Sequence, residues 1–95
     1  MIKVQFIGDG YIHVTGHAGA APHGKDIVCA GVSSLVCSLL ANLIAEGIEP
    51  IDASVEPGDV EIRCRPTRKA KRLFRYFRIG ITRFAEDYSE FVLIV

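Results

Sequence analysis

Residues 16–34 read GHAGAAPHGKDIVCAGVSS, and the rest of the chain is arranged around this stretch. It follows a strand-like segment, crosses a loop of small residues and enters a long apolar helix at Asp26. Cys29 falls in the first turn of that helix. Backbone N–H groups at a helix start lack intrahelical partners, and the helix dipole adds partial positive charge there. Both effects favour an anion, so this position suits the thiolate form of a cysteine.

A histidine precedes this cysteine across the loop. His17 lies twelve residues before Cys29, and the Gly-rich segment between them can fold back, so His17 is a candidate base for the thiol. Asp26 is placed either to cap the helix or to orient His17, and the two roles compete for one carboxylate. Ser33 follows one turn after Cys29 and is a candidate hydrogen-bond donor near the thiolate. The pattern predicts an activated cysteine nucleophile, with free N–H groups at the helix start near Cys29 to stabilise an oxyanion.

The run GHAGAAPHGKDIVCAGVSSL resembles the signature of the ribosomal-processing cysteine protease family, known as Prp, with the strong match covering about residues 16–42. The resemblance implies a small bacterial cytoplasmic protease. It further implies that the substrate is a large-subunit ribosomal protein, which loses a short N-terminal extension after an aromatic-rich sequence. Carried over position by position, the family's nucleophile falls on Cys29, its base on His17 and its motif aspartate on Asp26.

The loop after the first hairpin is rich in small residues, so we expect it to be mobile. The expected flexible positions are Gly16, Ala18, Gly19, Pro22 and Gly24. Two interpretations remain open. The loop is either a simple strand-to-helix connection or a flap that closes over a bound peptide and brings His17 to Cys29. The family resemblance favours the flap.

A metal site is an alternative use of the histidines. Period-two alternation places His13 on the same side as His17, with Cys29 or His23 as a third ligand, but the spacing matches no zinc motif. The chain has three cysteines and no CxxC pair, which indicates neither a zinc knuckle nor a disulfide framework. We therefore predict no metal and no cofactor. The other two cysteines, Cys37 and Cys64, are expected to be buried and inert.

The composition is that of one ordinary globular domain. The chain has 95 residues, of which 49% are hydrophobic and 23% charged, so residues 1–95 are expected to form a single cysteine protease domain. No uninterrupted apolar stretch approaches 18 residues, which argues against a membrane span. The alternating N-terminus lacks the apolar block of a signal peptide. The expected location is the cytoplasm.

Hydrophobic periodicity predicts a two-layer α+β sandwich with the order ββαββαβ. One sheet of about five strands carries two helices on one face. Two hairpins, a C-terminal strand and two helices whose apolar positions recur at three and four are expected at residues 2–16, 51–65, 91–95, 26–46 and 67–88. In the first helix this inward stripe runs from Val28 to Ile44. Gly31, costly inside a helix, indicates either close packing against the sheet or room for a substrate backbone.

The formal net charge is zero, but residues 68–83 carry seven Lys or Arg and no acid. This run is either a solvated face or a surface that attracts ribosomal RNA or an acidic partner. An alternative function is therefore a non-catalytic, ribosome-associated RNA-binding module that uses the second helix. A non-proteolytic thiol enzyme is a further alternative. The family resemblance, together with the apolar residues that a small domain leaves exposed, predicts a homodimer.

Overall fold

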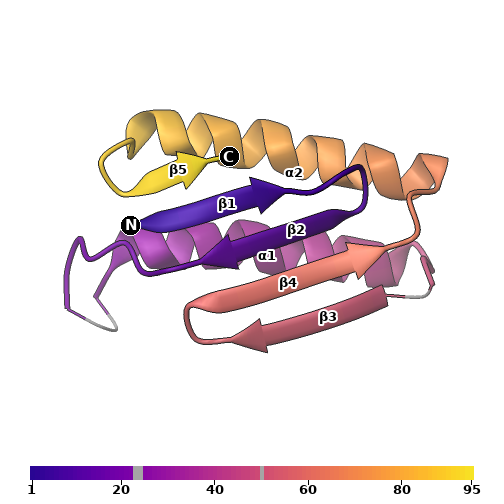
Figure 1. Ribbon diagram of the computed structural model, residues 1–95, viewed down its shortest axis with the longest axis horizontal. Coiled ribbons are helices and arrows are strands. Elements are labelled where there is room, and N and C mark those ends of the chain that lie inside the picture. The colour runs from indigo at the N-terminus through magenta and orange to yellow at the C-terminus, as the bar shows by residue number, and fades with distance from the viewer. Residues whose placement is uncertain (23–24, 50) are drawn as a thin grey trace.

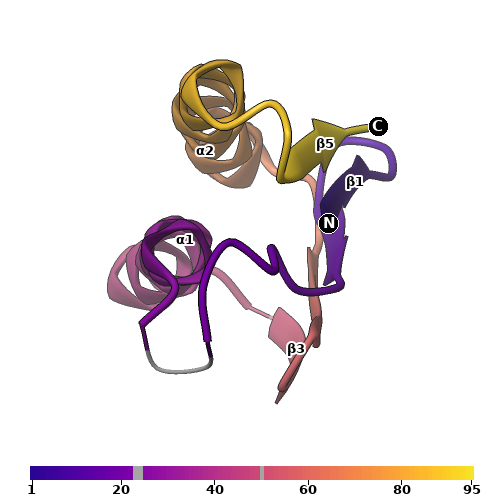
Figure 2. The ribbon, with the colours of Figure 1, turned by 90° about the vertical axis from the view of Figure 1, so that its left-hand side faces the viewer.

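The computed structural model describes residues 1–22, 25–49 and 51–95. Two helices cover one face of a five-stranded sheet, as Figure 1 and the turned view of Figure 2 show. In chain order the elements are β1 (Ile2–Phe6), β2 (Tyr11–Thr15), α1 (Ile27–Ala45), β3 (Ile51–Glu56), β4 (Asp59–Cys64), α2 (Arg68–Asp87) and β5 (Val92–Ile94). The predicted ββαββαβ order and two-layer α+β architecture are confirmed.

The sheet has the strand order β3-β4-β2-β1-β5. Both predicted hairpins are present as the antiparallel pairs β1/β2 and β3/β4, and β2 joins them by pairing antiparallel with β4. The C-terminal strand β5 runs parallel to β1 at the opposite edge from β3. Because β2 and β4 are antiparallel neighbours, the last residue of β2 and the β3–β4 turn lie next to each other at the same end of the sheet.

The core lies between the sheet and the helices. Alternate residues of each strand point to the same face, and the inner face of the central strands is formed by the buried Ile2, Val4, Ile12, Val14 and Ile62. The helices contribute stripes at three- and four-residue spacing, namely Val28, Val32, Val36, Leu39 and Leu43 from α1 and Ala70, Phe74, Phe77, Ile81 and Ala85 from α2. Val28, the first buried residue of α1, packs in this core, so the start of the helix lies over the sheet.

Gly31 marks a close contact between the two helices. A Cβ at this position would lie 2.4 Å from Cζ and 2.5 Å from Cε2 of Phe84 on α2. The Phe84 ring itself packs against Tyr88, with the ring centroids 4.8 Å apart, so it has little freedom to retreat. Of the two interpretations of Gly31, close packing or room for a substrate backbone, the structure therefore supports close packing. The packing partner of Gly31 is the second helix rather than the sheet.

We expect Gly31→Ala to destabilise the protein although alanine is the better helix former. Overpacking a core contact costs roughly 1–3 kcal/mol, and the gain in helix propensity is about 1 kcal/mol. Gly80 in α2 is a matched control, since its nearest neighbour would be Leu35 Cδ2 at an ordinary 3.7 Å. Urea unfolding should show Gly31→Ala less stable and Gly80→Ala more stable than the original chain. Equal stabilisation by both would contradict the packing role.

Two residues of α1 do not lie where the apolar pattern placed them. Cys37 is exposed rather than buried, and the side chain of Ile44 is 63% exposed. The two are seven positions apart, so they share one outward face. Residues 27–45 contain no charged residue, so the exposed polar residues Ser34, Ser38 and Asn42 are the side chains that mark the outward face of the helix. Cys64 is buried as predicted, and burial raises the pKa of its thiol.

By length and composition alone, α1 is apolar enough to cross a membrane, with a mean hydropathy of 2.2. The core helix of a soluble protein passes the same test. Here the inner face of α1 packs in the core under the sheet, at Val28, Val32 and Val36 among others. The apolarity of this face is explained by the fold, and only the uncharged outer face needs another explanation.

Candidate active site

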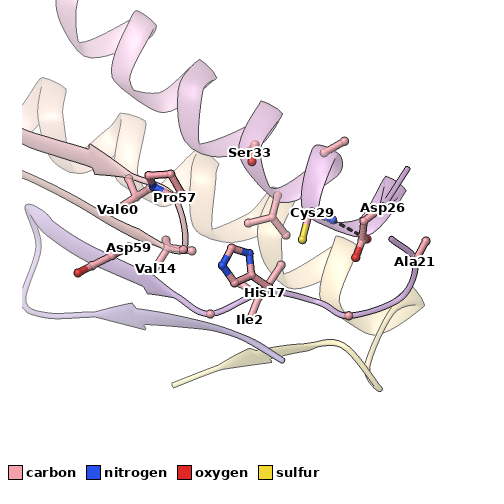
Figure 3. Close-up of a pocket in the computed structure, with 15 residues that line it drawn as sticks. Ile2, Val14, His17, Ala21, Asp26, Cys29, Ser33, Pro57, Asp59 and Val60 are labelled. Carbon is pink, nitrogen blue, oxygen red and sulfur yellow. Dashed lines mark hydrogen bonds between the residues drawn. The ribbon is translucent and has the colours of Figure 1, made fainter. Parts of the chain in front are cut away.

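A cleft of about 600 Å³ opens between the start of α1, the end of β2 and the β3–β4 turn (Figure 3). Its lining includes all four residues that the sequence singled out, His17, Asp26, Cys29 and Ser33. Gly16 and Gly19 of the loop also line it, and the far wall is formed by residues 57–60. The folded chain therefore brings the predicted site residues into one cavity.

The sulfur of Cys29 receives a backbone hydrogen bond. The N–H of Ala18 donates to Sγ at 3.3 Å, Ala18 is buried, and Cys29 itself is half-buried. An N–H aimed at the sulfur supports the charge of a thiolate through a charge-assisted hydrogen bond. The cysteine lies two residues after Ile27, the first residue of α1, where the helix dipole acts in the same direction.

His17 is held at its backbone and packed at its ring. Its carbonyl accepts a hydrogen bond from the Met1 ammonium at 2.6 Å, and the N–H of Gly16 donates to the carbonyl of Gly58 at 2.9 Å. A Cβ at Gly58 would lie 2.6 Å from Nε2 of His17. The Nε2 edge of the ring therefore lies over the β3–β4 turn. The other nitrogen, Nδ1, lies on the side of the ring nearer to Cys29 (Figure 3).

Asp26 is the N-cap of α1. Its Oδ1 accepts hydrogen bonds from the N–H groups of Val28 at 3.0 Å and Cys29 at 3.1 Å, and its Oδ2 accepts from Ala20 N–H at 3.0 Å. The carboxylate thereby ties the loop to the helix start. Of the two roles that competed, the cap is the one observed, and in the part of the chain that the structure describes no hydrogen bond joins Asp26 to His17.

The same cap corrects one expectation. The N–H groups of Val28 and Cys29 were expected to be free to stabilise an oxyanion, but both donate to Asp26. The N–H of Ala30 donates to the main-chain carbonyl of Asp26 at 3.1 Å. A capping side chain occupies the very donors that a helix start offers. The cap and an oxyanion hole at Cys29 N–H exclude each other in this conformation.

The hydrogen bond from Cys29 N–H is the main reason that the pKa of Asp26 lies below its ordinary value of 3.8. The ionised carboxylate therefore stabilises the fold above this pH, and the stabilisation is lost as the pH falls through the lowered pKa. We expect the original chain to exceed Asp26→Asn in stability at pH 7 and the difference to shrink below pH 3.8. Asparagine also caps well, so the comparison isolates the charge. Urea unfolding of both proteins at several pH values measures it, and a difference independent of pH would contradict the assignment.

The loop is fixed at both ends. Ala18 and Ala20 are held by Cys29 and Asp26, and Lys25 N–H donates to the carbonyl of Pro22 at 3.0 Å. Buried Ala18 thus belongs to the fixed base of the loop. Gly24 and His23 lie outside the described residues. His17 and Cys29 line the same cleft in this structure, and both the mobility of the loop and its closure as a flap stay predictions.

Ser33 and His13 were the remaining candidates. Ser33 is exposed and lines the cleft one turn beyond Cys29, and the described residues include no hydrogen bond between the two.

His13, the histidine considered for a metal site, pairs through Nε2 with Oδ1 of Asp59 at 2.7 Å across the β2–β4 pair. Within residues 1–22, 25–49 and 51–95, no group of three His, Cys, Asp or Glu could hold a metal ion. The proposed ligand His23 is outside these ranges.

Sequence reasoning missed the β3–β4 turn as part of the site. Pro57-Gly58-Asp59 falls inside the predicted hairpin of residues 51–65, and no role in the site was predicted for it, yet Gly58 contacts the ring of His17 and accepts the Gly16 hydrogen bond. These contacts join segments about 40 residues apart. No local signal marks them, because any hairpin turn favours glycine.

A half-buried cysteine near a helix start, with a backbone N–H on its sulfur and a histidine in the same cleft, is the arrangement of a cysteine hydrolase. Sequence comparison is specific about the family. The family described as cysteine protease Prp matches residues 1–93, and the chain therefore belongs to it. It is a cysteine protease, and its substrate is a peptide segment.

Two relatives carry the name ribosomal processing cysteine protease Prp. The protein of Bacillus subtilis (strain 168) is 46% identical over an alignment covering 81% of this chain and 76% of the relative. The protein of Mycoplasma genitalium is 28% identical, over an alignment that covers 99% of this chain and 94% of the relative. The crystal structure of an essential ribosomal processing protease Prp from S. aureus, in complex with a covalently linked product peptide, has the same fold. Its TM-score is 0.85 at 21% identity, covering 98% of this chain and 94% of that one.

Proposed function

We propose that this enzyme uses Cys29 as nucleophile and His17 as base to remove the N-terminal extension of a large-subunit ribosomal protein in the cytoplasm. The observation that carries the assignment of the nucleophile is the hydrogen bond from Ala18 N–H to Cys29 Sγ, in a cleft that His17 shares. The names of the B. subtilis and M. genitalium relatives support a ribosomal substrate. The peptide complex of the S. aureus enzyme supports cleavage of a peptide bond.

In the proposed mechanism, Nδ1 of His17 takes the proton of the Cys29 thiol. The thiolate attacks the carbonyl carbon of the scissile peptide bond, and the C–N bond breaks as the imidazolium gives its proton to the departing amine. The resulting thioester is hydrolysed by a water molecule that His17 deprotonates, which releases the carboxylic acid and restores the thiol. The Ala18 N–H donates its hydrogen bond to the sulfur of Cys29 rather than to the oxygen of the scissile carbonyl.

Asp26 and Ser33 act as supporting residues in this proposal. Asp26 holds the loop and the start of α1 together through Ala20 and Cys29, so it fixes the position of the nucleophile. Ser33 presents an exposed hydroxyl to the cleft one turn further along the helix. We assign it a hydrogen bond to the bound peptide or to the reacting sulfur.

The test is cleavage of the host's own extended ribosomal protein, followed by intact-mass measurement of the products. The original enzyme and Cys37→Ala should both remove the extension, because Cys37 is an exposed thiol that does not line the cleft. Cys29→Ala should leave the substrate uncut. Cleavage by Cys29→Ala would refute the nucleophile, and failure of the original enzyme to cut would refute the substrate.

We further propose that the enzyme is a homodimer joined through the outer face of α1. Residues 27–45 lack any charge, and Ile27 and Ile44 are 69% and 63% exposed. A solvated helix normally carries polar and charged residues on its outer face. The same face carries the polar Ser34, Ser38 and Asn42, and a second copy of the chain offers a matching uncharged surface for a symmetric dimer.

Ile44→Glu is expected to convert the dimer to a monomer, because it buries a charge in an apolar interface. The matched control is Ile79→Glu, which alters an isoleucine of similar exposure, 58%, on α2. Analytical ultracentrifugation should give a monomer for the first variant and a dimer for the second and for the original chain. A monomeric original chain, or dimers for both variants, would contradict this interface.

A further inference from the structure

The charged residues of the chain are separated by sign along the fold. Nine of the eleven Lys and Arg residues fall between residues 63 and 83, with no acid among them. Six of the eleven acids fall between residues 46 and 61, where there is no Lys or Arg. In the structure the acids lie on and around β3 and β4, whereas most of the bases lie on α2, which covers the sheet near its opposite edge, behind β1 and β5 (Figures 1 and 2). A net charge of zero thus conceals two surfaces of opposite sign.

The outward face of α2 carries an arginine stripe, defined here as Arg68, Arg72 and Arg75. These residues are spaced by four and three positions, so they lie on one side of the helix. The buried residues of α2 repeat with the same spacing from Ala70 to Ala85 on the opposite side. The stripe therefore points away from the sheet, into solvent, and Figure 2 shows α2 with its far side uncovered by other elements.

The stripe surrounds a hollow in the surface. The residues lining it are Arg68, Lys71, Arg72, Arg75 and Tyr76. Lys71 lies 3.8 Å from Asp9, while the ion pairs of the described residues include none to the three arginines. Tyr76 is 59% exposed beside them. Four cations around one hollow repel one another, and an anionic ligand would relieve that repulsion.

We propose that this face of α2 binds the phosphate backbone of RNA and thereby brings the protease to a substrate that is already associated with RNA. Guanidinium groups recognise phosphate through paired hydrogen bonds. An exposed tyrosine within the same hollow can stack on an unpaired base. The functional part of this inference rests on the proposed ribosomal substrate, but the binding of RNA does not.

The structure argues against the two other anionic partners. Binding to a membrane surface requires several apolar residues that insert below the charged face. The apolar stripe of α2 is buried at Phe74, Phe77 and Ile81, and Ile79 is the single large aliphatic side chain of this helix that is exposed. A protein partner normally covers an apolar centre inside a polar rim. Among the residues that line the hollow, Tyr76 is the single aromatic one, and none is aliphatic. The face therefore suits a polyanion.

RNA at this face would leave the cleft open. The N-terminal end of α2 follows β4 at the point where Cys64 N–H bonds to the carbonyl of Gly10, beside the β1–β2 turn. The cleft lies at the other end of these strands, where Gly16 meets Gly58. The protease can therefore hold RNA with α2 while a peptide chain occupies the cleft.

The test uses fluorescence anisotropy with a labelled single-stranded RNA of about 20 nucleotides, a length that exceeds the usual site size of such surfaces. With four cations on phosphates, log K should fall with log salt concentration at a slope of about −3. Arg72→Glu/Arg75→Glu should weaken binding at least tenfold and flatten this slope. Lys3→Glu/Arg63→Glu changes the net charge equally on the uncovered face of the sheet and should alter binding less than twofold.

Equal weakening by both double variants would overturn the proposal, since binding would then follow net charge alone. The absence of RNA binding at 50 mM salt, or binding only to phosphatidylserine vesicles or to polyglutamate in parallel titrations, would overturn it too. Cleavage of a short substrate peptide without RNA serves as the second readout. Arg72→Glu/Arg75→Glu should cut this peptide as fast as the original chain, so a failed RNA titration and a failed cleavage assay report on different claims.

Discussion

Cys29→Ala, His17→Ala and the double variant are expected to lose hydrolysis of a cleavable peptide to the same residual level, at least about 10³-fold below the original enzyme in kcat/KM. The reason is that the two side chains act as one unit. Without His17 the thiol has no base at hand, and without the thiol the imidazole has no proton to take. Residues that act together give losses that do not add.

The measurement is a double-mutant cycle on a fluorogenic peptide, with circular dichroism to show that each variant is folded. Two controls bracket it. Cys37→Ala removes an exposed thiol outside the cleft, and His13→Ala removes an imidazole that pairs with Asp59 instead of lining the site. Both should retain most of the activity. Additive losses for Cys29 and His17, or full activity of His17→Ala, would separate the proposed pair.

Much of the fold could be predicted because the signals are local. Alternation marked the strands of the first hairpin, a run of apolar and β-branched residues marked the C-terminal strand, and glycine or Pro-Gly turns marked the hairpins. Asp26, for which capping was one of two roles open, accepts backbone hydrogen bonds as the N-cap of α1, and Thr67 caps α2 in the same way. The side of α2 that faces the core could also be predicted from the sequence, because its apolar residues form one stripe and the Lys and Arg residues lie outside that stripe.

The rest depended on contacts that no local pattern contains. Cys37 was expected in the core because free cysteines are usually buried, although it lies on the side of α1 that carries the exposed Ser34, Ser38 and Asn42. Whether Asp26 caps the helix or orients His17 depended on tertiary geometry, because the folded loop places Ala20 N–H within hydrogen-bond distance of Oδ2. The role of the β3–β4 turn emerged only from the pairing of β2 with β4, which brings Gly58 to the ring of His17.

That turn leads to the second large effect. Gly58→Ala is expected to reduce kcat about 10²-fold, with little change in KM. A Cβ would lie 2.6 Å from Nε2 and 3.1 Å from Cε1 of His17. The ring must therefore shift, and a misplacement of about 1 Å can cost this much in rate. The backbone offers no easy adjustment, because Gly16 N–H is bonded to Gly58 and the His17 carbonyl to the Met1 ammonium.

A steric effect has to be separated from backbone strain, since Gly58 has a φ of +73°. Gly8 provides the control. It has a φ of +65° in the other hairpin turn, and a Cβ there would meet nothing within 4 Å. Both alanine variants should lose roughly 1–2 kcal/mol of stability from the left-handed conformation.

Activity distinguishes the two variants, because only Gly58→Ala moves the imidazole. Steady-state kinetics at a temperature where both variants are folded should show near-normal kcat for Gly8→Ala. Equal kcat for the two variants would mean that the turn supports the fold alone. A loss confined to Gly58→Ala would make this glycine a positioning residue for the catalytic histidine.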